Sequence, residues 1–317
     1  MDELSPKVVA TLTKELSPAS FRSVGFLELN KAFRFDVEFP KHDEERIARH
    51  ATILASRIDD RSPFARRRCH CAAASGKILG RMNREHHKNY SHELQRDMEA
   101  LVFGHAGQPL LVCPSSQGRF FEYEDAGMIR VLAPKIDAGQ LQVFCVDSVD
   151  SESWYNKSVH PGSRIWRHMQ YERYLINEFV PFVKWKNWAS QIAVTGCSFG
   201  GYHALNFSLR HPDLVSACVT MSGSYDIKSF LDGYYDDNVY FNNPADYLQG
   251  MNDEWFLNGY RQMKIVLGTS DWDMCLDANV KMAGLMHAKR IPHWLDIFGD
   301  NSKHDWPLWQ RMAGKYF

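Results

Sequence analysis

Long hydrophobic runs and an excess of charge of either sign are missing from this chain of 317 residues. Its apolar stretches, such as Leu110–Cys113 and Ile192–Val194, are far shorter than the roughly 20 residues that a membrane-spanning helix needs. The N-terminus has no apolar core followed by a small-residue cleavage site, so we expect neither export nor membrane association. The 37 basic and 38 acidic side chains nearly cancel, which argues against a nucleic-acid partner.

Paired cysteines and cofactor-binding patterns are missing as well. The seven cysteines are odd in number and scattered, as in a cytoplasmic protein with reduced thiols. Cys69, His70 and Cys71 have no second ligand pair at zinc-finger spacing, so they predict no metal site. No glycine-rich phosphate fingerprint follows a strand, so no cofactor is expected.

Tryptophan and tyrosine are absent from residues 1–81, whereas all nine Trp lie at Trp154 or later. Residues 1–81 carry 15 basic and 11 acidic side chains, and residues 82–317 carry 22 and 27. The first segment contains apolar patches but no sustained periodicity. We therefore predict a poorly structured N-terminal extension over 1–81 and a catalytic domain over 82–317, with Met82 as a candidate initiator.

From about residue 96, apolar runs of strand type alternate with segments of helical periodicity. This alternation predicts an α/β fold in which helices cover both faces of a mostly parallel central sheet. Strands are predicted over Met98–Phe103, Pro109–Cys113, Leu141–Val146, Ile192–Val194, Leu214–Met221, Lys264–Leu267 and His293–Phe298. Helices are predicted over Tyr123–Leu132, Arg167–Val183, Tyr202–Leu209, Asp277–Lys289 and Pro307–Tyr316.

The pattern G-x-S-x-G stands between a predicted strand and a predicted helix, as Gly196, Ser198 and Gly200. A serine on such a sharp turn exposes its hydroxyl above the sheet edge, and small neighbours allow adjoining backbone to approach. The turn also brings the Phe199 N–H to a helix N-terminus, where it can donate to a developing oxyanion. Ser198 is therefore the predicted nucleophile, although a glycine-rich corner chosen only for packing is the competing interpretation.

A nucleophilic serine needs a base, and in this topology the base follows a later strand. His304 lies between the last predicted strand and the last predicted helix, so its loop opens at the same sheet edge as the serine. His293 begins a strand and His287 lies within a helix, so both are weaker candidates.

The acid that orients the base is expected after the strand Lys264–Leu267. Asp271 and Asp273 both lie near that strand end, and the local pattern does not separate them. A D-x-D metal site is the less favoured interpretation, because further carboxylates at loop spacing are missing.

Three segments of this sequence resemble the serine esterases of the α/β-hydrolase superfamily, which include the S-formylglutathione hydrolases and, more distantly, the mycolyltransferases. They are Gly196–Gly201, Pro114–Asp125 and His304–Trp309, and they occur in the family's order. The resemblance covers about residues 82–317 and implies the α/β-hydrolase fold with a cofactor-free Ser-His-Asp mechanism.

The resemblance also implies roles for individual residues. The spacing to Asn279 favours Asp273 over Asp271 as the acid. The family's second oxyanion-binding amide comes from the loop after the third strand, where Ser116 is the best placement. Cys197 departs from the His that many hydrolases carry there, which leaves the serine chemistry intact.

Together these features predict a serine hydrolase that cleaves small-molecule carboxylic esters or thioesters, with assembly into a homo-oligomer left open. Two alternatives remain, an acyltransferase that uses the same acyl-enzyme and a non-catalytic binding module that keeps the fold. The aromatic and acidic stretch Tyr225–Asn258 is either an insertion that overhangs the serine or an ordinary helical connection.

Overall fold

The computed structural model describes residues 82–317. The predictions for residues 1–81, including the extension itself and the segment Cys69–Cys71, lie outside the described residues. Within the described part, eight strands form one sheet in the order β1-β2-β4-β3-β5-β6-β7-β8. They are β1 (Arg84–Ser91), β2 (Arg96–Phe103), β3 (Gln108–Cys113), β4 (Leu141–Val146), β5 (Ile192–Cys197), β6 (Val215–Met221), β7 (Lys264–Ser270) and β8 (Trp294–Phe298).

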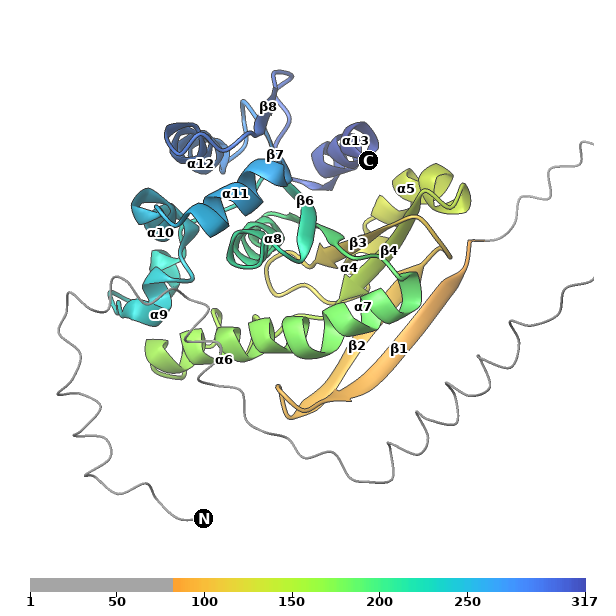
Figure 1. Ribbon diagram of the computed structural model, residues 1–317, viewed down its shortest axis with the longest axis horizontal. Helices are drawn as coiled ribbons and strands as arrows, with labels where there is room; N and C mark the ends of the chain where they lie inside the picture. Colours follow the sequence, from red (N-terminus) through yellow and green to blue (C-terminus); the bar gives the residue numbers. More distant parts are fainter. Residues whose placement is uncertain (1–81) are drawn as a thin grey trace, which may run out of the picture. The chain divides into compact units, whose positions relative to one another are not determined.

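The sheet is parallel from β4 to β8 and antiparallel only where β1 pairs with β2 and β2 with β4. Helices cover both faces, as Figure 1 shows, which confirms the predicted mostly parallel α/β architecture. The helices are α4 (Glu122–Asp125), α5 (Met128–Asp137), α6 (Pro161–Tyr174), α7 (Val180–Asn187), α8 (Phe199–Arg210), α9 (Asp237–Tyr240), α10 (Pro244–Gly250), α11 (Glu254–Gln262), α12 (Leu276–Ala288) and α13 (Trp306–Tyr316).

Two clusters of buried hydrophobic side chains lie on opposite faces of the sheet. In one, side chains of α5 and α13 pack on the sheet, and these two helices lie beside each other in Figure 1. In the other, side chains of α6, α7, α8, α10, α11 and α12 pack on the opposite face. Because parallel strands are buried on both faces, β4 and β5 read as continuous apolar runs and are buried throughout.

Three elements differ from the sequence-based prediction. The helix expected over Tyr123–Leu132 is divided into α4 and α5, because Gly127 takes a left-handed conformation with φ of 75°. The helix expected over Arg167–Val183 contains a π-helical turn at Leu175–Phe179, between α6 and α7. The edge strand β1 has no sequence-based counterpart, since it carries mostly polar and charged residues.

Candidate active site

Ser198 occupies a strained turn between β5 and α8. Its φ of 55° and ψ of −120° lie in a region that non-glycine residues rarely adopt, at a cost of about 1–3 kcal/mol. The turn is held by the Ser198 N–H, which donates to the Met221 carbonyl oxygen at 2.8 Å. A half-buried serine held in this way matches the sharp strand-to-helix turn that the G-x-S-x-G pattern predicts.

The glycines around Ser198 are required by close backbone approaches. A Cβ atom on Gly196 would lie 2.2 Å from the Gly200 carbonyl oxygen, and one on Gly200 would lie 2.5 Å from the Pro114 carbonyl oxygen. A Cβ atom on Gly201 would lie 2.8 Å from Gly223 Cα. Real Cβ atoms essentially never come this close, so a larger residue at any of these positions would displace the turn or a neighbouring strand end.

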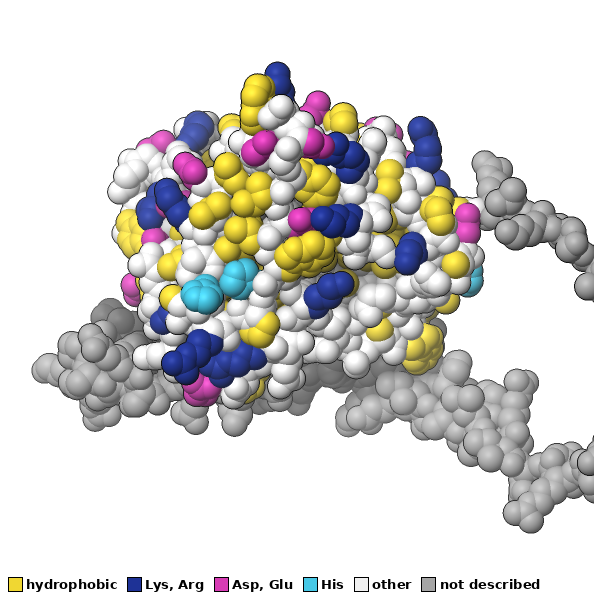
Figure 2. All heavy atoms as spheres, turned by 90° about the horizontal axis from the view of Figure 1, so that it is seen from above, with side chains coloured by type: hydrophobic (Ala, Val, Ile, Leu, Met, Phe, Trp, Pro, Cys, Tyr) yellow, Lys and Arg dark blue, Asp and Glu magenta, His cyan; other side chains and the backbone are white. Residues whose placement is uncertain are grey.

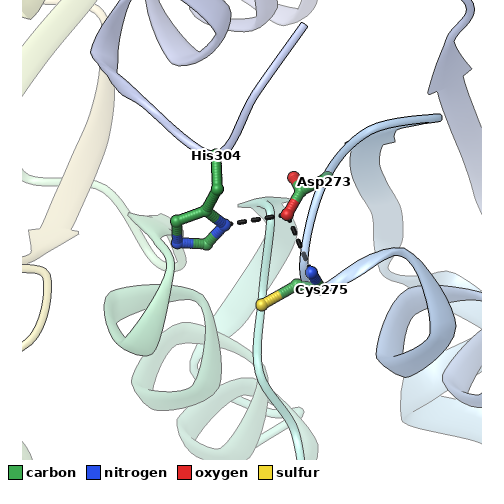
Figure 3. Close-up of side chains that lie close together, drawn as sticks. All are labelled: Asp273, Cys275 and His304. Atoms are coloured by element: carbon green, nitrogen blue, oxygen red, sulfur yellow. Dashed lines mark hydrogen bonds and ion pairs between the residues drawn. The ribbon is translucent and has the colours of Figure 1, made fainter. Parts of the chain in front are cut away.

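His304 lies between the predicted nucleophile and one of the two candidate acids. Its Nε2 is 2.8 Å from Ser198 Oγ, and its Nδ1 is 2.8 Å from Asp273 Oδ1; Figure 3 shows the imidazole turned toward the carboxylate. The three residues follow β5, β7 and β8, whose carboxyl ends meet at one edge of the sheet. With Nδ1–H donating to Asp273, Nε2 is free to accept the serine proton.

The structure separates the two candidate acids. Asp273 is buried, and its Oδ1 accepts from both His304 and the Cys275 N–H. Asp271 is exposed, and its carboxylate accepts from the Asn301 N–H at 3.0 Å. The rival base His293 contacts the Ile291 carbonyl oxygen instead of this site.

Comparisons with known proteins identify the family of the chain. The family model described as "Putative esterase" matches residues 91–312. The chain belongs to this esterase family. It is therefore a carboxylic ester hydrolase. A separate comparison with curated protein sequences found no significant match.

Solved structures of esterases share the fold. A ferulic acid esterase is 18% identical with a TM-score of 0.61, and the match covers 74% of this chain and 96% of that one. An S-formylglutathione hydrolase from Agrobacterium tumefaciens is 12% identical with a TM-score of 0.60, covering 76% and 95%. A ferulic acid esterase from Anaeromyces mucronatus is 12% identical with a TM-score of 0.57, covering 76% and 90%. At such identities the likeness establishes the α/β-hydrolase fold, as expected from the sequence.

The Asp273 carboxyl group of the esterase stays charged despite its burial. Burial alone would raise its pKa, but the hydrogen bonds from His304 and the Cys275 N–H, together with the nearby Ser222 hydroxyl, outweigh burial, so the pKa lies below its usual value. Sequence reasoning missed Ser222, whose hydroxyl accepts from the Trp309 indole N–H at 2.8 Å; its signal is only a serine at a strand end.

Asp273, Cys275 and His304 also resemble a metal-binding group, since their ligand atoms lie within 4.8 Å of one another (Figure 3). Burial, with a smaller contribution from Asp273, raises the pKa of the Cys275 thiol to about 12. A protonated thiol is a poor metal ligand. Asp273 Oδ1 already accepts two N–H groups, so these residues fit a hydrogen-bonded chain better than a metal centre.

The segment after β3 presents a backbone amide near this site. The Ser115 N–H donates to Glu122 Oε2 at 2.8 Å, and the Gln117 N–H donates to Asp150 Oδ2 at 3.2 Å. Between them, the Ser116 N–H has no acceptor among residues 82–317. The Phe199 N–H begins α8, where a helix provides no internal acceptor. The two predicted oxyanion donors are thus both left available.

Aromatic side chains pack beside Phe199, and a groove lies beside Gln117. Phe230, from the stretch Tyr225–Asn258, packs against Phe199 with ring centroids 4.8 Å apart, while Tyr235 from the same stretch is exposed. This stretch contains α9 and α10, and Phe230 in it packs on the body of the domain beside the residue that follows Ser198. A groove of about 460 Å³ lies between the segment after β3 and the start of α13, and its lining includes Gln117, Phe121 and Trp306.

The surface of the described part mixes side chains of different kinds. On the face drawn in Figure 2, basic and acidic side chains are interspersed, and hydrophobic side chains gather near the middle. Among residues 82–317, no helix is long and apolar enough to cross a membrane.

Proposed function

We propose that Ser198, His304 and Asp273 are the catalytic triad of this esterase and that it acts on small-molecule acyl esters. The proposal rests on one observation, the chain of two 2.8 Å hydrogen bonds that joins the Ser198 hydroxyl to the buried Asp273 carboxylate through His304. A serine at a strained strand-to-helix turn, an imidazole and a carboxylate in this order have the geometry that acyl transfer requires.

In the first half-reaction, Ser198 Oγ attacks the carbonyl carbon of the ester while His304 Nε2 takes the hydroxyl proton. The negative charge moves to the carbonyl oxygen, where the Phe199 and Ser116 N–H groups donate to it. The carbon–oxygen bond to the alcohol then breaks, and His304 gives its proton to the departing oxygen. The products are the free alcohol and a Ser198 acyl ester.

In the second half-reaction, water attacks the acyl-enzyme and His304 Nε2 takes a water proton. The second tetrahedral species collapses, Ser198 Oγ recovers the proton from His304, and the carboxylic acid leaves. The Asp273 carboxylate stabilises the protonated imidazole that exists between the two proton transfers.

Ser198→Ala tests the proposal, because this change removes only the attacking oxygen. We expect ester turnover and fluorophosphonate labelling to disappear while the melting temperature stays close to that of the wild type. Ser208→Ala is a matched control, since Ser208 is a buried serine on α8 whose hydroxyl donates to the Ala204 carbonyl oxygen, within its own helix. Undiminished labelling of Ser198→Ala would refute the assignment, and labelling at Cys197 would move it by one residue.

A hydrolysis panel defines the substrate class. Esters with short, medium and long acyl groups, together with S-formylglutathione, are assayed with and without added alcohol or thiol acceptors. We expect the free acid as the main product, because water is the proposed acceptor. Acyl transfer to the added acceptor as the main product would establish the acyltransferase alternative.

We also propose a cytoplasmic location. The five cysteines in the described part of the chain are all free, and four of them are buried. Free thiols are typical of reducing compartments. Fractionation of cells that make the protein at its native level tests this location.

A further inference from the structure

A buried carboxylate–imidazole pair lies behind the proposed site and takes no part in the steps above. His203 Nε2 donates to Asp150 Oδ1 at 2.9 Å, and the two side chains are only 3% and 1% exposed. Burying two such groups is costly unless each is well partnered. The contacts that Asp150 and His203 make with other segments indicate what this pair does.

Asp150 holds the segment that carries the Ser116 amide. Its second oxygen, Oδ2, accepts from the Gln117 N–H at 3.2 Å, and Gln117 has a left-handed φ of 55°. Nearby, the Ser148 hydroxyl donates to the Gly118 carbonyl oxygen at 2.8 Å. The loop after β4 therefore fixes the loop after β3 through side chains that reach its backbone.

His203 lies against the segment that carries the second amide. It is on α8, four residues after Phe199, and the two rings make an edge-on contact with centroids 5.0 Å apart. The pair thus connects the strand-to-helix turn at Ser198 with the loop after β3. The Asp150 carbonyl oxygen also accepts from the Tyr155 N–H at 3.0 Å, and the Tyr155 ring packs edge-on against Phe199.

We propose that Asp150 and His203 are positioning residues that hold the Ser116 and Phe199 amides at the distance required to bind one oxyanion; this inference rests on the proposed function. Ser116 lies between Ser115, which Glu122 holds, and Gln117, which Asp150 holds. Without the Asp150 acceptor, the Gln117 N–H loses its partner, and only the neighbouring bonds from Gly118 N–H to Ser115 and from Ser148 to Gly118 still hold the turn, so the Ser116 amide can shift. A misplacement of about 1 Å at such a site can lower the rate by about 100-fold.

The test compares Asp150→Ala with Asp150→Asn on an oxygen ester and on the matching thionoester, in which sulfur replaces the carbonyl oxygen. Sulfur is a weak hydrogen-bond acceptor, so a well-positioned pair of amides favours the oxygen ester. We expect Asp150→Ala to lower kcat for the oxygen ester by about 10- to 100-fold with little change in KM, and to lower the oxygen-to-sulfur rate ratio. Asp150→Asn keeps an acceptor for Gln117 and should recover most of both.

A purely structural role predicts a different result. Loss of folded enzyme lowers both rates by one factor and leaves their ratio unchanged, and the final stoichiometry of fluorophosphonate labelling reports the active fraction. Glu172→Gln is the matched control, because the buried Glu172 of α6 forms an ion pair with Arg210 at the end of α8. We expect this variant to melt at a lower temperature with an unchanged ratio.

Each outcome decides one question. A wild-type kcat for Asp150→Ala, or a lower kcat with an unchanged ratio, refutes the positioning role. If Asp150→Ala does not fold, His203→Leu and His203→Gln make the same comparison, since only glutamine keeps an N–H donor for Asp150. Full activity of Ser198→Ala would instead refute the proposed function itself.

Discussion

Replacing Asp273 by Asn should remove the charge that stabilises the protonated His304 and leave the packing around it unchanged. The amide oxygen can take the position of Oδ1, where it still accepts from His304 and from the Cys275 N–H. The rate should therefore fall through electrostatics, with little change in KM, because the imidazole of the resting enzyme in this mechanism is neutral.

The size of the effect follows from the distance. At 2.8 Å and an effective dielectric constant of about 20, a carboxylate and an imidazolium attract each other by about 6 kcal/mol. Since 1.36 kcal/mol corresponds to a tenfold change in rate, kcat should fall by about 10⁴-fold. Asp271→Asn should change kcat by no more than about twofold, because Asp271 is exposed and its amide can still accept from Asn301.

Steady-state kinetics on one ester, with burst titration of active sites, measures both variants. A larger loss for Asp271→Asn than for Asp273→Asn would refute the assignment of the acid.

Thermal melts test the same carboxylate through the pH dependence of stability. Because the pKa of Asp273 is lowered in the folded protein, its stabilising contribution is present above the unfolded value of about 3.9 and disappears as the pH falls through the lower folded value. The difference in melting temperature between the wild type and Asp273→Asn should shrink below about pH 4.

Three further predictions use other parts of the molecule. Gly201→Ala should lower stability by about 1–3 kcal/mol and reduce ester turnover, because the new Cβ would meet backbone at 2.8 Å. Gly284→Ala, in an open position on α12, should raise stability by up to about 1 kcal/mol with unchanged activity; equal stability losses in both would refute the steric argument. A chain that begins at Met82 should keep the esterase activity and nearly the same melting temperature, and an insoluble or inactive product would assign residues 1–81 to the core. Burial opposes the charged form of Glu172, but Arg210 and His211 outweigh burial and lower its pKa. The destabilisation caused by Glu172→Gln should therefore be large at pH 7 and should begin to shrink only as the pH falls below about 4, in melts from pH 7 into the acid range.

The strands of the central sheet were predictable because a strand that is buried on both faces is a nearly continuous apolar run in the sequence. Leu141–Val146 is predicted and observed with the same bounds, since each of its residues is buried. Breaks within helices have a weaker sequence signal. Gly127 divides the helix predicted over Tyr123–Leu132. The sequence did not predict this break, because a single glycine in a helical pattern is often tolerated.

Candidate site residues were predictable where a motif or a strand end marks them, as at Ser198 and His304. The local pattern alone could not choose between Asp271 and Asp273. That difference depends on which carboxylate turns inward, and their partners lie 30 and 31 positions away in the sequence. No sequence pattern predicted the pairing of Asp150 with His203. The two residues are 53 positions apart, and they meet only when the loop after β4 lies against α8 in the fold.

The order in which the strands carry the proposed triad has a consequence for the timing of synthesis. Ser198 follows β5, but Asp273 and His304 follow β7 and β8, and Trp309 on the final helix packs edge-on against His304. Synthesis proceeds from the N-terminus, and a domain generally folds as a unit once its chain is complete. Under the proposed mechanism, a nascent chain therefore contains its serine before it has a base to activate it, and products of interrupted translation that end before β8 lack that base.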